Sequence, residues 1–165
     1  MGSAVRKAAA GWALLGGVFV FLIMVVTSLN VGAFALDRVT GPMGVPLSGL
    51  PGYEDFVRLL VSCAALMFFP FCQSRRAHVT VELFVSALPK FVQVLLDRVW
   101  LAAMLALSLF LAYWMTLGML ETRSDNALSP VLGWAEWPFY LPGILSLLLW
   151  AAVIAGQLVS GESDA

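Results

Sequence analysis

The sequence contains little charge. Only 12% of its 165 residues are charged, and the formal net charge is −1, whereas charged residues make up about a quarter of a typical soluble domain. So few charges cannot cover the surface of a small water-soluble protein, which excludes an ordinary soluble enzyme domain and a disordered tail. Because basic residues are not in excess, a nucleic-acid partner is excluded as well.

Residue types that catalyse reactions or bind metals are equally scarce. His78 is the single histidine, so this chain alone cannot supply the two axial histidines of a membrane haem, and a metal site lacks partner ligands. Cys63 and Cys72 lie nine residues apart on one predicted helix, about 13 Å along its axis, which is too far for a disulfide. No catalytic triad, CxxC pair or phosphate loop is present. The sequence therefore predicts no catalytic residue, no cofactor and no metal.

Apolar residues dominate instead, at 61% of the chain, and the mean hydropathy is +0.94. About 20 apolar residues in a helix cross roughly 30 Å of hydrocarbon. Four segments suit such a crossing, and they cover residues 11–36, 56–73, 99–120 and 137–158. The first is longer than the apolar part of a signal peptide, so we expect it to be retained. The predicted fold is all-α, a single membrane domain over residues 1–165 with four transmembrane helices.

The distribution of basic residues predicts the orientation, because cytoplasmic loops are richer in Lys and Arg. Six basic residues fall on the side of the two termini: Arg6, Lys7, Arg75, Arg76, Lys90 and Arg98. Three fall on the other side: Arg38, Arg58 and Arg123. Both termini are therefore expected in the cytoplasm. Trp134, Trp137 and Tyr140, near the start of the fourth segment, are typical of an aromatic belt at the outer interface.

Residues 79–88, between the second and third segments, have a different pattern. Val81, Phe84, Val85 and Leu88 recur at helical spacing among polar residues, which predicts a short amphipathic helix lying in the cytoplasmic interface. Pro89 is expected to end it, because a proline disfavours helix in the residue before it. The alternative is that Val79 begins a long third helix.

The predicted spans are nearly free of ionisable residues, and none lies at the centre of a span. This argues against a proton-coupled exporter and against a transporter that works without a partner. Glu54, Asp55 and Arg58 form an outer-end polar cluster at the start of the second helix. Their i,i+3 and i,i+4 spacing predicts that they neutralise one another.

A second polar cluster, Arg75, Arg76, His78 and Glu82, follows the second helix. Its charge pattern is compatible with a basic cytoplasmic loop and equally with a contact surface for lipid headgroups or a partner subunit.

The residues around this cytoplasmic cluster carry a resemblance to a known family. Ser74 to Leu83, SRRAHVTVEL, followed by Leu88-Pro89, resembles the central motif of the DctQ family, the small membrane subunits of TRAP (tripartite ATP-independent periplasmic) transporters. Thr80, where a basic residue is common, and Glu82, where Asp is commoner, are mild departures. Glu54 before an apolar run, and Ser129-Pro130 before a Trp-rich lead into the fourth helix, are similar to further family features.

The resemblance implies a scaffold subunit of the inner membrane with no chemistry of its own. Its partners would be a large multi-span permease subunit that carries the substrate and sodium sites, a periplasmic binding protein that delivers an organic acid, and membrane phospholipids. Arg75, Arg76, His78 and Glu82 are then expected to anchor the subunit at the cytoplasmic interface. The alternative is the membrane anchor of a multi-subunit oxidoreductase, which the absence of paired histidines disfavours.

Overall fold

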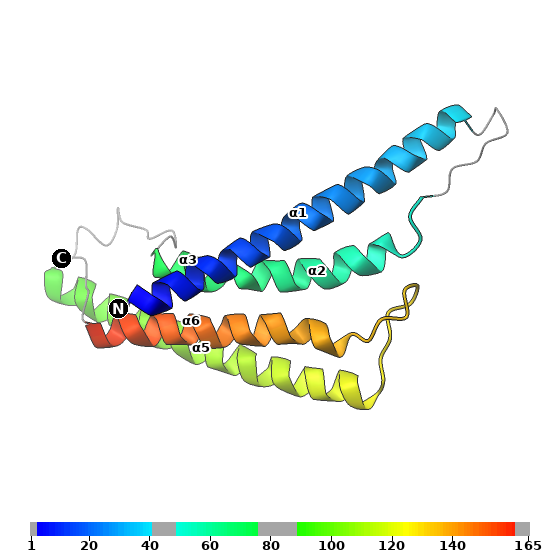
Figure 1. Ribbon diagram of the computed structural model, residues 1–165. Helices are drawn as coiled ribbons and strands as arrows, with labels where there is room; N and C mark the ends of the chain where they lie inside the picture. The colour runs from blue at the N-terminus through cyan, green and yellow to red at the C-terminus, as the bar shows by residue number, and fades with distance from the viewer. Residues whose placement is uncertain (1–2, 41–48, 76–88, 161–165) are drawn as a thin grey trace.

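The computed structural model describes residues 3–40, 49–75 and 89–160, and the fold is all-α, as predicted (Figure 1). Its helices are α1 (Ser3–Thr40), α2 (Tyr53–Met67), α3 (Phe69–Ser74), α5 (Lys90–Ser124), the short 3₁₀ helix η2 (Trp137–Phe139) and α6 (Tyr140–Ser160). Four helical segments are long and apolar enough to cross a membrane, with α2 and α3 forming one of them and η2 and α6 another. This confirms an all-α membrane protein with four spans.

The helices extend beyond the predicted apolar segments. Helix α1 continues past residue 36 through Asp37 and Arg38, and α5 begins at Lys90, nine residues before the predicted apolar segment 99–120. Helix α5 begins at Lys90, and Pro89 before it is extended, with ψ of 143°. A third helix that started at Val79 would thus be interrupted at Pro89. The predicted interfacial helix, residues 79–88, lies outside the described residues.

The second span is broken at Phe68, where α2 ends and α3 begins. Pro70 explains the break. It has no N–H to donate and its ring would collide with the carbonyl four residues earlier in a continuous helix, whereas the first turn of a new helix tolerates it. Phe68 accordingly donates its N–H to Leu66 O in a tighter turn. Helices α2 and α3 together still form one span, from Tyr53 to Ser74.

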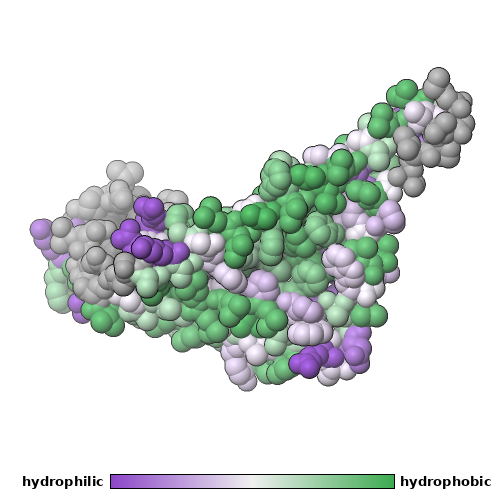
Figure 2. Space-filling view, viewed as in Figure 1, coloured by the Kyte–Doolittle hydropathy of each residue, from purple (hydrophilic) through white to green (hydrophobic). Residues whose placement is uncertain are grey.

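Helix α6 lies at the centre of the bundle and packs against α1, α2, α3 and α5. Val153 and Ile154 on α6 are fully buried. The outer surfaces of α1 and α5, in contrast, expose large apolar side chains such as Phe21, Leu29 and Phe110. Figure 2 shows hydrophobic residues over the middle of the visible face and hydrophilic ones gathered towards both ends. Such a surface requires lipid or another subunit around it.

Helices α1 and α2 approach closely at Gly16. A Cβ atom added there would lie 3.0 Å from Met67 Cβ and 3.5 Å from the Ala64 carbonyl oxygen, whereas one added at Gly17 would meet nothing within 4 Å. Small residues permit close approach of membrane helices. Gly16 therefore permits the close packing of α1 on α2, and Gly17 faces open space.

The two glycines form a matched test of this contact. Alanine is the better helix former by about 1 kcal/mol, so Gly17→Ala is expected to stabilise the protein slightly. Gly16→Ala gains the same propensity but crowds Met67, and we expect it to be less stable than Gly17→Ala by about 1 kcal/mol or more. Thermal denaturation of both variants in one detergent measures the difference. Equal stability would show that α1 and α2 can separate at no cost.

Candidate functional site

A short hairpin connects α5 to η2 at the end of the bundle where α2 begins. It comprises residues 125–136, hereafter the hairpin, and contains the single bridge between Leu128 and Ala135. Ser129 N–H donates to Trp134 O at 2.8 Å, and Gly133 N–H donates to Ser129 O at 3.0 Å. Gly133 adopts a φ of +66°, a conformation that favours glycine. The hairpin is thus internally ordered rather than a loose loop.

Asp55, in the first turn of α2, holds the tip of this hairpin. Its Oδ2 atom accepts the backbone N–H of Val131 at 2.8 Å and that of Leu132 at 3.0 Å. The residue is only 5% exposed although it carries a carboxylate. Hydrogen bonds to a charged group are worth about 1.5–3 kcal/mol each. Asp55 therefore acts as a clamp between α2 and the hairpin.

Gly52 allows α2 to begin directly beneath the hairpin. It has a φ of +79°, and a Cβ atom there would lie 2.5 Å from Leu132 Cδ2. Any other residue would both strain the backbone and collide with the hairpin. The tight turn at Gly52 is thus part of what brings Asp55 within reach of Val131 and Leu132.

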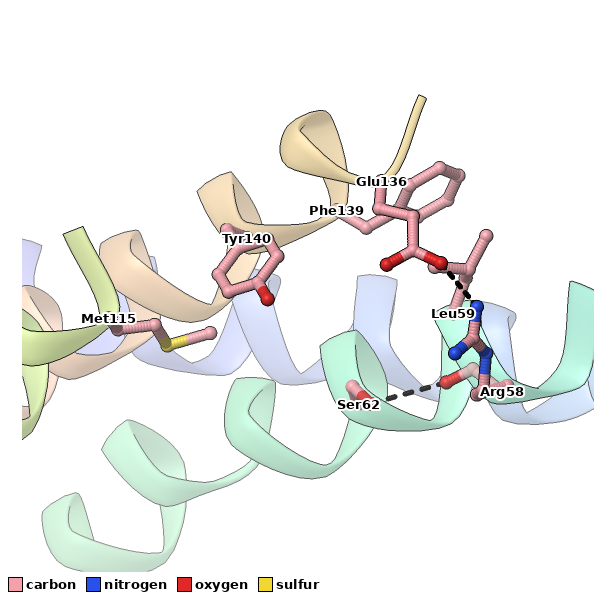
Figure 3. Close-up of a pocket in the computed structure, with 7 residues that line it drawn as sticks. All are labelled: Arg58, Leu59, Ser62, Met115, Glu136, Phe139 and Tyr140. Atoms are coloured by element: carbon pink, nitrogen blue, oxygen red, sulfur yellow. Dashed lines mark hydrogen bonds and ion pairs between the residues drawn. The ribbon is translucent and has the colours of Figure 1, made fainter. Parts of the chain in front are cut away.

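Arg58, one turn further along α2, forms an ion pair with Glu136, the last residue of the hairpin (Figure 3). Of the predicted mutual neutralisation of Glu54, Asp55 and Arg58, the structure retains a Coulombic attraction between Arg58 and Asp55, but the ion pair of Arg58 is with Glu136. Glu54 is exposed, Asp55 binds backbone N–H groups, and Arg58 pairs across the bundle. Local helical spacing could not reveal this, because the competing partner is 78 residues away.

A pocket of about 320 Å³ lies beside this ion pair, between α2, α5 and the start of α6. Figure 3 shows that its polar lining consists of Arg58, Ser62, Glu136 and Tyr140. Leu59, Met115 and Phe139 supply apolar walls. The pocket therefore combines one cation and one anion with a largely apolar interior.

The opposite end of the bundle holds a buried polar network. Gln73 Nε2 donates to Gln157 Oε1 at 2.8 Å, and Gln157 Nε2 donates to the Gln73 carbonyl at 2.9 Å. Trp150 Nε1 donates to Gln73 Oε1 at 3.3 Å. All three residues are at most 5% exposed. The network fixes α3 against α6 just before the chain leaves the bundle.

The predicted cytoplasmic cluster is described only in part. Arg75 is exposed and its guanidinium lies 5.5 Å above the ring of Phe71, an arrangement typical of a cation–π contact. Arg76, His78 and Glu82 lie outside the described residues. Within the described ranges, no three His, Cys, Asp or Glu side chains come close enough to hold a metal ion.

Three contacts in the structure were missed by sequence reasoning. Gln73 and Gln157 are isolated amides in apolar segments, a signal that polar side chains pair inside the bundle. The Ser129-Pro130 pair was noted only as a resemblance, yet Ser129 Oγ accepts the Trp134 N–H at 3.0 Å and helps to shape the hairpin. The pairing of Arg58 with Glu136 left no local signal.

Comparison with known proteins supports the resemblance. The model of the family described as "Tripartite ATP-independent periplasmic transporters, DctQ component" matches residues 47–163, which is most of the chain. The matched region begins just before α2 and includes the hairpin, the pocket and the glutamine network. No curated protein and no solved structure matches the chain at a significant level.

Proposed function

The chain belongs to the DctQ family of small membrane subunits of TRAP transporters, and from this premise we propose that it is a fixed scaffold for a larger transporting subunit. The family match over residues 47–163 carries the proposal. In this role the chain has no chemistry of its own. The exposed apolar faces of α1 and α5 are surfaces on which a large multi-span subunit and lipid could pack.

The interior of the bundle supports a scaffold role rather than independent transport. Among the described residues, every buried side-chain nitrogen or oxygen has a hydrogen-bond partner. Trp12 Nε1, for example, donates to Ser146 Oγ at 2.7 Å, and that hydroxyl donates to the Pro142 carbonyl at 2.7 Å. These buried groups are bonded to one another, which supports an interior that is closed to sodium and to a solute. Those ligands would belong to the large subunit.

The further features of the proposal follow the family. The complex would lie in the bacterial inner membrane and use a sodium gradient to import an organic acid delivered by a periplasmic binding protein. Both termini lie at the end of the bundle opposite the hairpin (Figure 1). With the termini in the cytoplasm, the hairpin and the ordered start of α2 would face the periplasm, where the binding protein docks.

Purification of the tagged chain from its native membrane in mild detergent tests the proposal. We expect a large polytopic membrane protein to follow it, and we expect deletion of the chain to abolish sodium-dependent uptake of an organic acid. Recovery of a soluble, cofactor-bearing enzyme with a haem or flavin spectrum would instead support the oxidoreductase anchor. Uptake by the purified chain alone in vesicles would contradict a purely structural role.

The cytoplasmic cluster gives a residue-level prediction within this proposal. Arg75, Arg76, His78 and Glu82 are proposed to anchor the subunit to lipid phosphates or to the partner. We expect His78→Ala combined with Glu82→Ala to reduce recovery of the large subunit at least severalfold. Glu54→Ala, an exposed acid at the other end, is the control. Unchanged recovery and uptake in the double variant would contradict the anchoring role.

A further inference from the structure

The pocket beside the Arg58–Glu136 ion pair has unused binding capacity. A guanidinium carries five N–H donors and a carboxylate accepts through two oxygens, and among the residues that the structure describes the two side chains are joined by one contact, from Arg58 Nη2 to Glu136 Oε1. The remaining donors and the second oxygen can bind a ligand without breaking the pair. Arg58 keeps 55% of its side chain exposed, and Glu136 keeps 22%. The pair therefore presents adjacent positive and negative groups to an incoming molecule.

The lining of the pocket changes from charged to apolar along the axis of the bundle. Its charged residues, Arg58 and Glu136, lie at the hairpin end of the bundle. Met115 lies deeper: it is six residues before Glu121, an acidic residue near the hairpin end of α5, and therefore about 9 Å further into the apolar segment. Beyond the pocket, Leu111 on α5, one turn past Met115, is exposed and apolar. A fully water-soluble ion would gain nothing from such walls. A ligand with a charged head and an apolar tail matches both parts.

We propose that this pocket binds the headgroup of a zwitterionic phospholipid that carries a primary ammonium, of the phosphatidylethanolamine type. The phosphate would accept hydrogen bonds from Arg58, and the ammonium would donate to Glu136. The acyl chains would continue over the apolar surface between α2 and α5. The volume of about 320 Å³ is at the lower end of the range of ligand sites, about 300–1,000 Å³, and fits a headgroup rather than a whole lipid.

The proposed chemistry predicts a selectivity among lipids. Phosphatidylglycerol lacks the ammonium, and phosphatidylcholine has a quaternary ammonium that donates no N–H bond. Loss of one charge-assisted hydrogen bond corresponds to about a tenfold weaker affinity. We therefore expect phosphatidylethanolamine to bind about tenfold more tightly than either of the other two. This site is independent of the proposed transport role and of the cytoplasmic cluster.

Native mass spectrometry of the delipidated chain, titrated separately with the three lipids, tests the site. The double variant Arg58→Gln with Glu136→Gln is expected to lose the preference for phosphatidylethanolamine, and Glu54→Gln is expected to keep it. Ser62→Phe fills the pocket without altering charge and is expected to reduce binding about tenfold. Ser124→Phe is its matched control, because Ser124 is also exposed and bonded to its own helix, to Glu121 O at 2.8 Å. Circular dichroism confirms that each variant is folded.

A diazirine side chain at Met115 tests the same site in the intact membrane complex. A photo-adduct with phosphatidylethanolamine that Ser62→Phe abolishes supports the proposal. An adduct with another protein would overturn it, since a subunit would then occupy the pocket. Equal binding of all three lipids, or no effect of Ser62→Phe in the titration, would overturn it too.

Discussion

Replacing Asp55 by alanine is expected to release the hairpin from α2 and to lower the free energy of unfolding by about 3 kcal/mol. The variant leaves the N–H groups of Val131 and Leu132 without their acceptor at a residue that is only 5% exposed. Each hydrogen bond to a charged acceptor is worth about 1.5–3 kcal/mol, and because Val131 is 63% exposed, water replaces part of what is lost. Thermal denaturation in detergent measures the loss, and limited proteolysis within the hairpin shows whether it opens locally.

Two further variants separate the causes of this effect. Asp55→Asn keeps an oxygen that can accept both N–H groups but removes the charge, so we expect roughly half of the loss. Glu54→Ala removes the adjacent but exposed carboxylate and is expected to change stability by less than about 0.5 kcal/mol. If Asp55→Ala behaved like Glu54→Ala, the hairpin would be held by its own bridge and not by the clamp.

Replacing Gln157 by leucine is expected to have the second largest effect. It leaves Gln73 with an amide group and a carbonyl that lose their partners inside an apolar bundle. Hydrogen bonds between membrane helices average about 0.6 kcal/mol and reach about 1.7 kcal/mol, and two are lost here. We expect a destabilisation of about 1–3 kcal/mol, measured by thermal denaturation in detergent.

A double-mutant cycle checks that the network, and not the leucine itself, is responsible. Gln73→Leu with Gln157→Leu removes both amides together and is expected to cost less than the sum of the single variants. Trp150 then keeps an unpaired indole N–H, so recovery is incomplete. Strictly additive losses would mean that the two glutamines do not depend on each other.

The arrangement of four helices was predictable because it depends on apolar length. A membrane span needs about 20 apolar residues, and each of the four segments satisfies this by its own sequence. Pro70 near the end of the second segment likewise indicates a local break, which the structure places at Phe68. The role of Gly16 in close packing could be inferred from its size, although sequence alone could not separate it from Gly17.

The contacts that hold the hairpin end together were not predictable in the same way. Helical spacing relates residues three or four positions apart, so it points Arg58 to Glu54 and Asp55 and cannot reveal the ion pair with Glu136. The actual partner, Glu136, comes near only after α5 and the hairpin return to α2. The function of Asp55 as an acceptor for two backbone N–H groups depends on the hairpin's fold and on the positive φ of Gly52, and neither can be read from the residues around Asp55.

The unequal lengths of the spans have a consequence for the surrounding bilayer. Residues 8–36 of α1 contain no charge and extend about 44 Å, whereas residues 59–74, between Arg58 and Arg75, extend about 24 Å. A hydrocarbon layer of about 30 Å is thinner than the first and thicker than the second. Hydrophobic mismatch of opposite sign on two packed helices is relieved by tilting α1 and by thinning the lipid beside α2. The layer of lipid that surrounds this subunit is therefore expected to be thinner beside α2 than beside α1.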